Sequence, residues 1–307
     1  MGTQLPLWTD LPEITDTKEI AFQPIRTPLW TSNKAQLISK YLYYFVLITK
    51  HGIYIDGFAA PQEPEQENSW AAKLVLDTQP KKFHLREYWL CELDPVRARF
   101  LEELEEITSD RHKTRIEILV GDFNKEVHKI LKDGSIKEKT AAFCLLDQRT
   151  FECEWATVET LATHKRNGHK IEQFYFLATG WLDRAFSGLT VNTHKAEKWW
   201  GGPGWGDLRS MDGNRRARIF ADRFKKDLGY TYATPWPIFE KGNTGRVMYH
   251  MIHATDHPEA PKIMARAYRK ATSAPEPIEQ LELELRQLVK ELPSELGVEL
   301  PAYQPKS

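Results

Sequence analysis

Residues 53–61 read Ile-Tyr-Ile-Asp-Gly-Phe-Ala-Ala-Pro, a short apolar run that ends in a carboxylate and a glycine. Such a run is typical of a buried central strand with a turn at its carboxyl end. Gly57 has no Cβ, so the backbone of that turn can approach a ligand closely. The stretch therefore predicts a parallel strand followed by a ligand-binding turn.

The segments on both sides of this strand extend the same plan. Upstream, Thr31, Ser32 and Asn33 offer an N-cap for a helix whose apolar residues recur at helical spacing until Gly52. Downstream, apolar runs alternate with amphipathic segments, which predicts a mostly parallel sheet with helices on both faces. The predicted strands cover residues 88–92, 116–120, 141–146 and 171–177, and the predicted helices cover residues 69–77, 95–106 and 155–164 and a segment around 127–131.

Residues 230–239 and 246–253 are two β-rich runs that predict an antiparallel hairpin at the sheet edge, followed by a helix at residues 259–270. The predicted fold is a Rossmann-like α/β domain over residues 31–270, with a seven-stranded sheet and helical decorations. A lead-in at residues 1–30 precedes it, and a glycine-rich, lid-like insertion occupies residues 181–228. An amphipathic helix and tail at residues 276–307 follow, with an apolar seam formed by Ile278, Leu281, Leu285, Leu288 and Leu292.

Composition excludes several classes of protein. The formal net charge is -1, no apolar run approaches the roughly 20 residues of a membrane span, and the first residues do not resemble a secretory signal. We therefore expect a soluble, cytoplasmic protein. Cys91, Cys144 and Cys153 form no CxxC pair and predict buried free thiols, and the histidines lack a compact metal-ligand spacing, so we expect no metal site.

Acidic residues follow three further strands, at the edge where open α/β sheets bind their ligands. Glu92 can accept both hydroxyls of a ribose. Asp122 can accept from an adenine amino group, and Phe123 can cover the ring. Asp147 would then line a reaction pocket. Each residue alone is better explained as a turn or helix cap, but their order and spacing predict an adenosine-binding site.

Other nucleotide-binding classes are disfavoured. Dehydrogenases place a full G-x-G-x-x-G loop after the first strand, and only Gly57 of that pattern is present. The chain also lacks the G-x-x-x-x-G-K-[ST] loop of nucleotide hydrolases and the H-E-x-x-H helix of zinc enzymes.

The motifs together resemble those of the three-Cys-motif partner family of bacteria, over about residues 30–270. A helix containing Lys34 and Tyr41 precedes the matching segments. These are YIDGFAAP (54–61), CELDP (91–95), VGDFN (120–124), LLDQRTFECEW (145–155) and VMYHMIHATDHPEAPKIM (247–264).

This resemblance implies a class I methyltransferase that uses S-adenosylmethionine. It places the turn of Asp56, Gly57, Phe58 and Ala59 at the methionine end of the cofactor, Glu92 at the ribose, Asp122 and Phe123 at the adenine, and Asp147 near the acceptor. It also implies a partner protein with a three-cysteine, radical-enzyme-like cluster. Ala60-Pro61 stands where the family often has another glycine, and residues 147–150 (DQRT) differ from the Asp-Pro-Pro-Tyr of amino-methylating enzymes.

The acceptor chemistry is predicted from residues 147–149. Asp147 with Gln148 could orient an acceptor nitrogen toward the sulfonium methyl. Arg149 could hold a phosphate, and an ion pair with Glu152 or Glu154 is the equal alternative.

A basic, tryptophan-containing segment raises the possibility of nucleic-acid binding. Residues 195–226 hold nine Lys or Arg against four Asp or Glu. We predict acceptor contacts by Trp199, Trp200, Trp205, Arg215 and Arg216. In the alternative, Arg215, Arg216 and Arg218 form the solvated face of a helix, and the tryptophans close a lid.

Two functions follow. The first is a methyltransferase that acts on a nucleic acid or on a protein-associated acceptor. The alternative is a non-catalytic binding protein that retains the fold and holds the three-cysteine partner or a nucleic acid. The apolar seam favours the binding protein, whereas Glu92 and Asp122 favour the enzyme.

Overall fold

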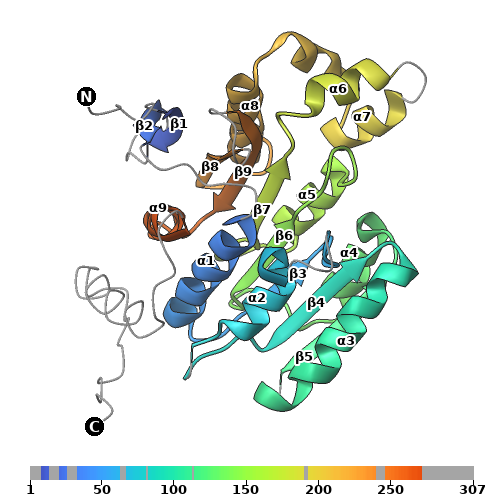
Figure 1. Cartoon of the computed structure of the whole chain (residues 1–307), viewed down its shortest axis with the longest axis vertical. Helices are drawn as coiled ribbons and strands as arrows, with labels where there is room; N and C mark the ends of the chain where they lie inside the picture. Colours follow the sequence, from blue (N-terminus) through green and yellow to red (C-terminus); the bar gives the residue numbers. More distant parts are fainter. Residues whose placement is uncertain are drawn as a thin grey trace, which may run out of the picture. The chain divides into compact units, whose positions relative to one another are not determined.

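A computed structural model describes residues 8–13, 21–25, 33–62, 67–80, 82–112, 114–189, 193–239 and 246–271. Its main sheet has seven strands in the order β5-β4-β3-β6-β7-β9-β8 (Figure 1). The first five in this order run parallel, and β9 is antiparallel to both β7 and β8. The strands are β3 (Ile53–Asp56), β4 (Glu87–Glu92), β5 (Arg115–Val120), β6 (Ala142–Leu146), β7 (Glu172–Leu177), β8 (Tyr232–Phe239) and β9 (Val247–Thr255).

This strand order confirms the predicted Rossmann-like, class I methyltransferase fold with its antiparallel C-terminal hairpin. From β3 the chain moves outward to β5 and then returns to β6 on the other side of β3. The reversal creates a crevice beyond the carboxyl ends of β3 and β6, which is where ligands bind in such sheets. The strand that the sequence predicted as central is buried along its whole length.

Helices follow the strands at the predicted places. α1 precedes the sheet, and Asp122 caps α4 by accepting from the backbone N–H of Asn124. α3 extends six residues beyond the predicted end at residue 106. The helices outside the insertion are α1 (Lys34–Thr49), α2 (Ala71–Asp77), α3 (Pro95–His112), α4 (Phe123–Lys132), α5 (Trp155–Thr163) and α9 (Ala260–Ala271).

The structure describes part of the predicted lead-in and none of the predicted C-terminal segment. The lead-in contains an antiparallel pair of strands, β1 (Trp8–Glu13) and β2 (Ala21–Ile25), which was not predicted. The predicted helix and tail at residues 276–307 lie outside the described residues.

The predicted insertion is helical and has an aromatic interior. It comprises α6 (Leu182–Gly188), α7 (Thr193–Trp200), the 3-10 helix η3 (Pro203–Ser210) and α8 (Gly213–Lys226). The ring of Trp199 packs against Phe220, at 5.0 Å between ring centroids, and against Phe151 at 4.9 Å. The Arg223 guanidinium lies 3.8 Å from the ring centroid of Trp155. These contacts join the insertion to the domain core.

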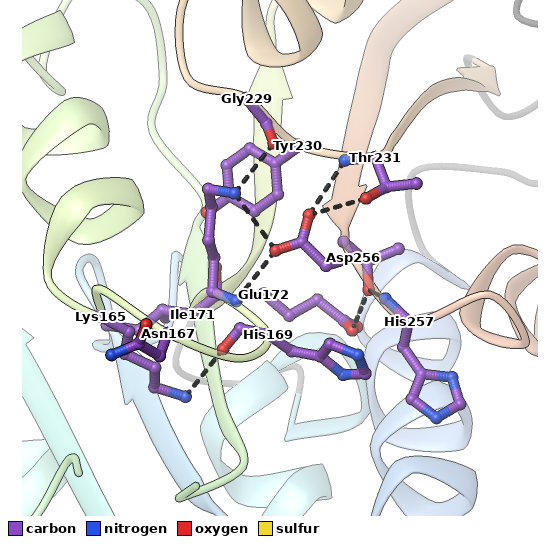
Figure 2. Close-up of polar contacts among 12 residues, drawn as sticks. Lys165, Asn167, His169, Ile171, Glu172, Gly229, Tyr230, Thr231, Asp256 and His257 are labelled. Carbon is purple, nitrogen blue, oxygen red and sulfur yellow. Dashed lines mark hydrogen bonds and ion pairs between the residues drawn. The ribbon is translucent and has the colours of Figure 1, made fainter. Parts of the chain in front are cut away.

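Polar contacts join the end of β9 to the residues that precede β7 and β8, as Figure 2 shows. The Asp256 carboxylate accepts from the backbone N–H of Lys170 at 3.0 Å and from that of Thr231 at 2.9 Å. Burial raises the pKa of Asp256, but the hydrogen bonds from Lys170 and Thr231 outweigh it and hold the pKa below its ordinary value. Nearby, the buried Glu172 accepts from the Thr255 hydroxyl at 2.8 Å.

Three further observations bear on the sequence predictions. Cys91, Cys144 and Cys153 are buried free thiols, as predicted. A search of the described residues finds no helix that combines the length and apolarity needed to cross a membrane. Within the same residues, no cluster of three or more His, Cys, Asp and Glu side chains is arranged to hold a metal ion.

Candidate functional site

The carboxyl ends of β3, β4, β5 and β6 open onto one cavity of about 460 Å³, which we call the inner cavity. Gly57, Glu92, Asp122 and Asp147 each follow or end one of these strands, and all four line the cavity. Its volume falls within the roughly 300–1,000 Å³ that small-molecule sites occupy. The fold therefore brings the predicted strand-end residues together.

Glu92 is held rigidly but keeps one oxygen available. The residue is only 6% exposed. Its Oε1 accepts from the backbone N–H of Asp94 at 3.0 Å and lies 3.7 Å from Nη1 of Arg97. Oε2 has no hydrogen-bond partner among the described residues. A fixed carboxylate with one unused oxygen at the cavity wall is suited to a pair of hydroxyls.

Asp122 caps a helix, which is one of the two roles that the sequence allowed, and keeps one oxygen without a partner in the described part of the chain. Its Oδ1 caps α4, accepting from the backbone N–H of Asn124 at 3.0 Å and from its side-chain amide at 2.8 Å. Its Oδ2 has no partner among the residues that the structure describes. Phe123 begins α4 and contributes to the same wall, although it is almost wholly buried.

The turn after β3 differs from the expectation for Gly57. A Cβ at this position would lie 2.8 Å from the Phe123 ring, so the close approach that requires glycine is made by Phe123 and not by a ligand. The backbone amides of the turn are also engaged within the protein. Gly57 donates to the carbonyl of Leu145, Phe58 to the Asp56 side chain and Ala59 to the carbonyl of Cys91.

Asp56 lies behind the turn and does not line the inner cavity. Its Oδ2 accepts from the Tyr54 hydroxyl at 2.7 Å, and its Oδ1 accepts from the backbone N–H of Phe58 at 3.1 Å. Burial raises the pKa of Asp56 to about 7, against these two hydrogen bonds, which lower it. Asp56 and Ala59 line a neighbouring cavity of about 370 Å³, which we call the middle cavity.

Asp147 stands between the inner and middle cavities and lines both. Its Oδ1 accepts from the Lys34 ammonium at 2.7 Å, and both side chains are largely buried. The same ammonium lies 4.8 Å from the ring centroid of Phe176 and 5.2 Å from that of Tyr249. Lys34 thus fixes one oxygen of Asp147, and the other has no partner among the described residues.

The structure corrects the prediction that Gln148 orients an acceptor. Gln148 is 1% exposed, and its Oε1 accepts from the backbone N–H of Cys153 at 3.0 Å. Gln148 lines neither the inner nor the middle cavity. Its side chain therefore holds the loop of residues 147–153 in place. The sequence could not distinguish these roles, because adjacent residues in a loop can point in opposite directions.

Three of the predicted substrate contacts are also corrected by burial. Trp199 and Trp205 pack inside the insertion, where neither presents a surface to an acceptor. Arg216 is 1% exposed, pairs with Asp183 and donates from Nε to the carbonyl of Leu208 at 2.8 Å. Arg216 therefore joins α8 to α6 and η3 by non-covalent contacts inside the insertion.

Of the remaining predicted residues, Arg149 lines the inner cavity, whereas Arg215 and Trp200 do not. Arg149 is exposed and lines the inner cavity, with no side-chain ion pair among the described residues. Glu152 accepts from the backbone N–H of Arg149, which is not the predicted side-chain pair. Arg215 is exposed on α8. Trp200 is half-buried, and the Arg223 guanidinium lies 4.2 Å from its ring centroid. Neither Arg215 nor Trp200 lines the inner or middle cavity.

Arg97 lines the inner cavity and was missed by the sequence analysis. It extends from α3, and its Nη2 donates to the carbonyl of Pro61 at 3.0 Å and to that of Ala60 at 3.3 Å. Because its other nitrogen approaches Glu92, Arg97 joins the turn after β3 to the carboxylate after β4. Its place in the first turn of the helix after Glu92 was the available signal.

Comparisons with known proteins find structural likeness at low sequence identity. M. jannaschii TYW2 in complex with AdoMet is 8% identical at a TM-score of 0.38, and the match covers 80% of this chain and 86% of that chain. An O-methyltransferase from Bacillus cereus in complex with SAH is 13% identical at 0.40, covering 70% and 79%. A Legionella pneumophila protein of the family DUF519 is 8% identical at 0.46, covering 79% and 92%. No protein-family model and no curated protein matches the sequence.

Proposed function

We propose that this chain binds S-adenosylmethionine in the inner cavity and transfers its methyl group to an acceptor presented beside Asp147. The observation that supports this most directly is the arrangement of three carboxylates around one cavity. Glu92 and Asp122 each keep an oxygen without a partner among the described residues, and Asp147 lies at the passage to the middle cavity.

The residues present fit the adenosine part of such a cofactor. The unused oxygen of Glu92 would accept from the ribose hydroxyls, and that of Asp122 from the adenine amino group. Leu93 and Phe58 supply apolar surface in the same cavity. The methionine part would not be held by the amides of Gly57, Phe58 and Ala59, because these already donate within the protein.

The bound cofactor would supply an electrophilic methyl group on a sulfonium sulfur. Asp147 would accept a hydrogen bond from the acceptor atom and orient its lone pair. The Lys34 ammonium would hold the Asp147 carboxylate in one rotamer through their ion pair, and the ammonium itself is held near the rings of Phe176 and Tyr249. The middle cavity would exclude water from the acceptor atom.

Isothermal titration of the purified chain with S-adenosylmethionine and S-adenosylhomocysteine tests the cofactor site. We expect micromolar binding that Glu92→Gln weakens at least about tenfold, because the variant loses a charge-assisted hydrogen bond. Glu87→Gln is the matched control, since Glu87 begins the same strand at the far end. Absence of binding by the unaltered chain, or equal binding by Glu92→Gln, would contradict the proposal.

The alternative is a binding protein that keeps the fold without catalysis. One observation favours it: the turn after β3 has its amides engaged and the Phe123 ring against Gly57, so it offers no open anion-binding loop. A chain that binds neither S-adenosylmethionine nor S-adenosylhomocysteine yet captures a partner would support this function instead.

We also propose a three-cysteine protein as the partner, on the motif resemblance alone. The apolar seam of residues 278–292, which lies outside the described residues, is the proposed contact. Leu285→Asp in the full chain should abolish co-purification of the two proteins while leaving cofactor titration unchanged. Undiminished co-purification would exclude the seam.

A further inference from the structure

We propose that a third cavity, formed by the loop after β6, the start of α6 and β9, binds the phosphate and base of a nucleotide that serves as the methyl acceptor. The inference rests on the proposed function and specifies its substrate class. This outer cavity has a volume of about 520 Å³. Its described lining consists of Gln62, Arg149, Thr150, Trp181, Arg184, Ala185 and Tyr249.

The charged residues in the described lining of the outer cavity are all basic. Arg149 and Arg184 line it, and no acidic residue is among its described lining residues. Both arginines are exposed, and neither has an ion pair with a described residue. Guanidinium groups in this state are suited to the oxygens of a phosphate, which they bind in pairs of parallel hydrogen bonds.

Three other arginines in or near the insertion are already engaged. Arg216 pairs with Asp183, and Arg223 pairs with Asp227 at 2.8 Å. Arg246 donates to the carbonyl of Gly180 at 3.0 Å. Arg149 and Arg184 differ from these three arginines, because their guanidinium groups have no ion pair with a described residue and both line the outer cavity.

Aromatic side chains stand beside the two cations. Trp181 is 37% exposed, and the Arg184 guanidinium lies 4.7 Å from its ring centroid. Tyr249 forms a second wall. Gly180 brings these elements together, because a Cβ there would lie 2.7 Å from the carbonyl oxygen of Val247. Exposed aromatic faces next to arginines stack bases while the cations bind the backbone.

The outer cavity adjoins the middle cavity, and through it the proposed reaction site. It shares Gln62, Trp181 and Tyr249 with the middle cavity, and the middle cavity shares Asp147 with the inner cavity. A nucleotide with its phosphate at the two arginines would therefore direct its base past Trp181 toward Asp147. Anionic groups and flat rings occur together in nucleotides, which is why we favour this class over an acidic peptide.

Fluorescence anisotropy with a labelled single-stranded oligothymidylate, and titration with adenosine monophosphate, test the proposal on the full chain. Arg184→Ala and Trp181→Ala should each weaken oligonucleotide binding about tenfold. Arg184→Ala should also lower the salt dependence by about one ion. Arg215→Ala, an exposed arginine on α8, is the matched control and should bind like the unaltered chain.

The outcomes distinguish the sources and separate this inference from the proposed function. Binding of the oligonucleotide alone identifies a strand as the ligand of the outer cavity, and equal binding of the mononucleotide identifies a free nucleotide. Unchanged binding in both variants, or equally tight binding of polyglutamate, overturns the inference. Because Arg184 and Trp181 do not line the inner cavity, S-adenosylmethionine affinity should stay unchanged in both variants and reports on the cofactor site independently.

Discussion

The ammonium of Lys34, at the start of α1, lies 2.7 Å from Oδ1 of Asp147, 113 positions away at the end of β6. The side chains are 12% and 14% exposed, so water screens this pair only partly. The contact joins the first helix of the domain to the loop that carries the proposed acceptor ligand.

Removing one partner of this pair should be costly. Lys34→Met leaves the Asp147 carboxylate without its counter-charge, and we expect the free energy of unfolding to fall by about 1–3 kcal/mol. In a double-mutant cycle with Asp147→Asn, measured by urea denaturation, the coupling should exceed about 1 kcal/mol. The corresponding cycle for Lys73 and Asp77, a surface pair on α2, should give about 0.3–0.5 kcal/mol. Equal coupling in both cycles would contradict this prediction.

Gly57→Ala should destabilise the protein through the Phe123 ring. The added Cβ would lie 2.8 Å from that ring, and overpacking of this kind costs about 1–3 kcal/mol. Phe123→Leu in the same chain should recover part of the loss, which chemical denaturation measures. Gly188→Ala is the control, since a Cβ there meets nothing within 4 Å. Additive effects of Gly57→Ala and Phe123→Leu would show that the contact is not the cause.

The stability should depend on pH through Asp56. Burial raises its pKa from 3.8 to about 7, so between these values the folded state holds a proton that the unfolded state has lost. This contribution to stability is complete below pH 3.8 and is lost as the pH rises to about 7, by about 1.4 kcal/mol per pH unit. The difference in unfolding free energy between Asp56→Asn and the unaltered chain should therefore shift in favour of the variant over this range. A constant difference would refute the assignment.

His250 should give the opposite dependence. It is buried between Thr179, 2.9 Å from its Nδ1, and Asn214 on α8, 3.0 Å from its Nε2. Burial lowers its pKa from 6.5 to about 3, so the unfolded chain binds a proton that the folded chain does not. Stability is thus complete above pH 6.5 and falls as the pH drops toward 3.

His250→Gln keeps a neutral polar side chain and should flatten this part of the profile. Thermal denaturation at pH 4, 5, 6 and 7 measures the difference from the unaltered chain. A difference that does not change with pH would show that His250 carries the same charge in the folded and unfolded states.

The sequence alone determined the fold of the core and the position of the site along the chain. Apolar runs of four to seven residues ending in Asp56, Glu92 and Asp147 form strands because local hydrophobic pattern and turn residues act over short distances. Since parallel strands share one carboxyl edge, the order of these acids placed them at that edge, where Glu92 and Asp147 line the inner cavity and Asp56 lines the middle cavity.

Tertiary packing alone decided which polar and aromatic residues face that cavity. Trp199, Arg216 and Gln148 are residue types that are suited to ligand binding, but each is enclosed by neighbours from distant segments. Lys34 lines the middle cavity and Arg184 lines the outer cavity, each beside residues that are distant from it in sequence. A sequence states which side chains exist along each element, whereas burial and ion pairing depend on contacts between elements, and these form only when the whole domain has folded.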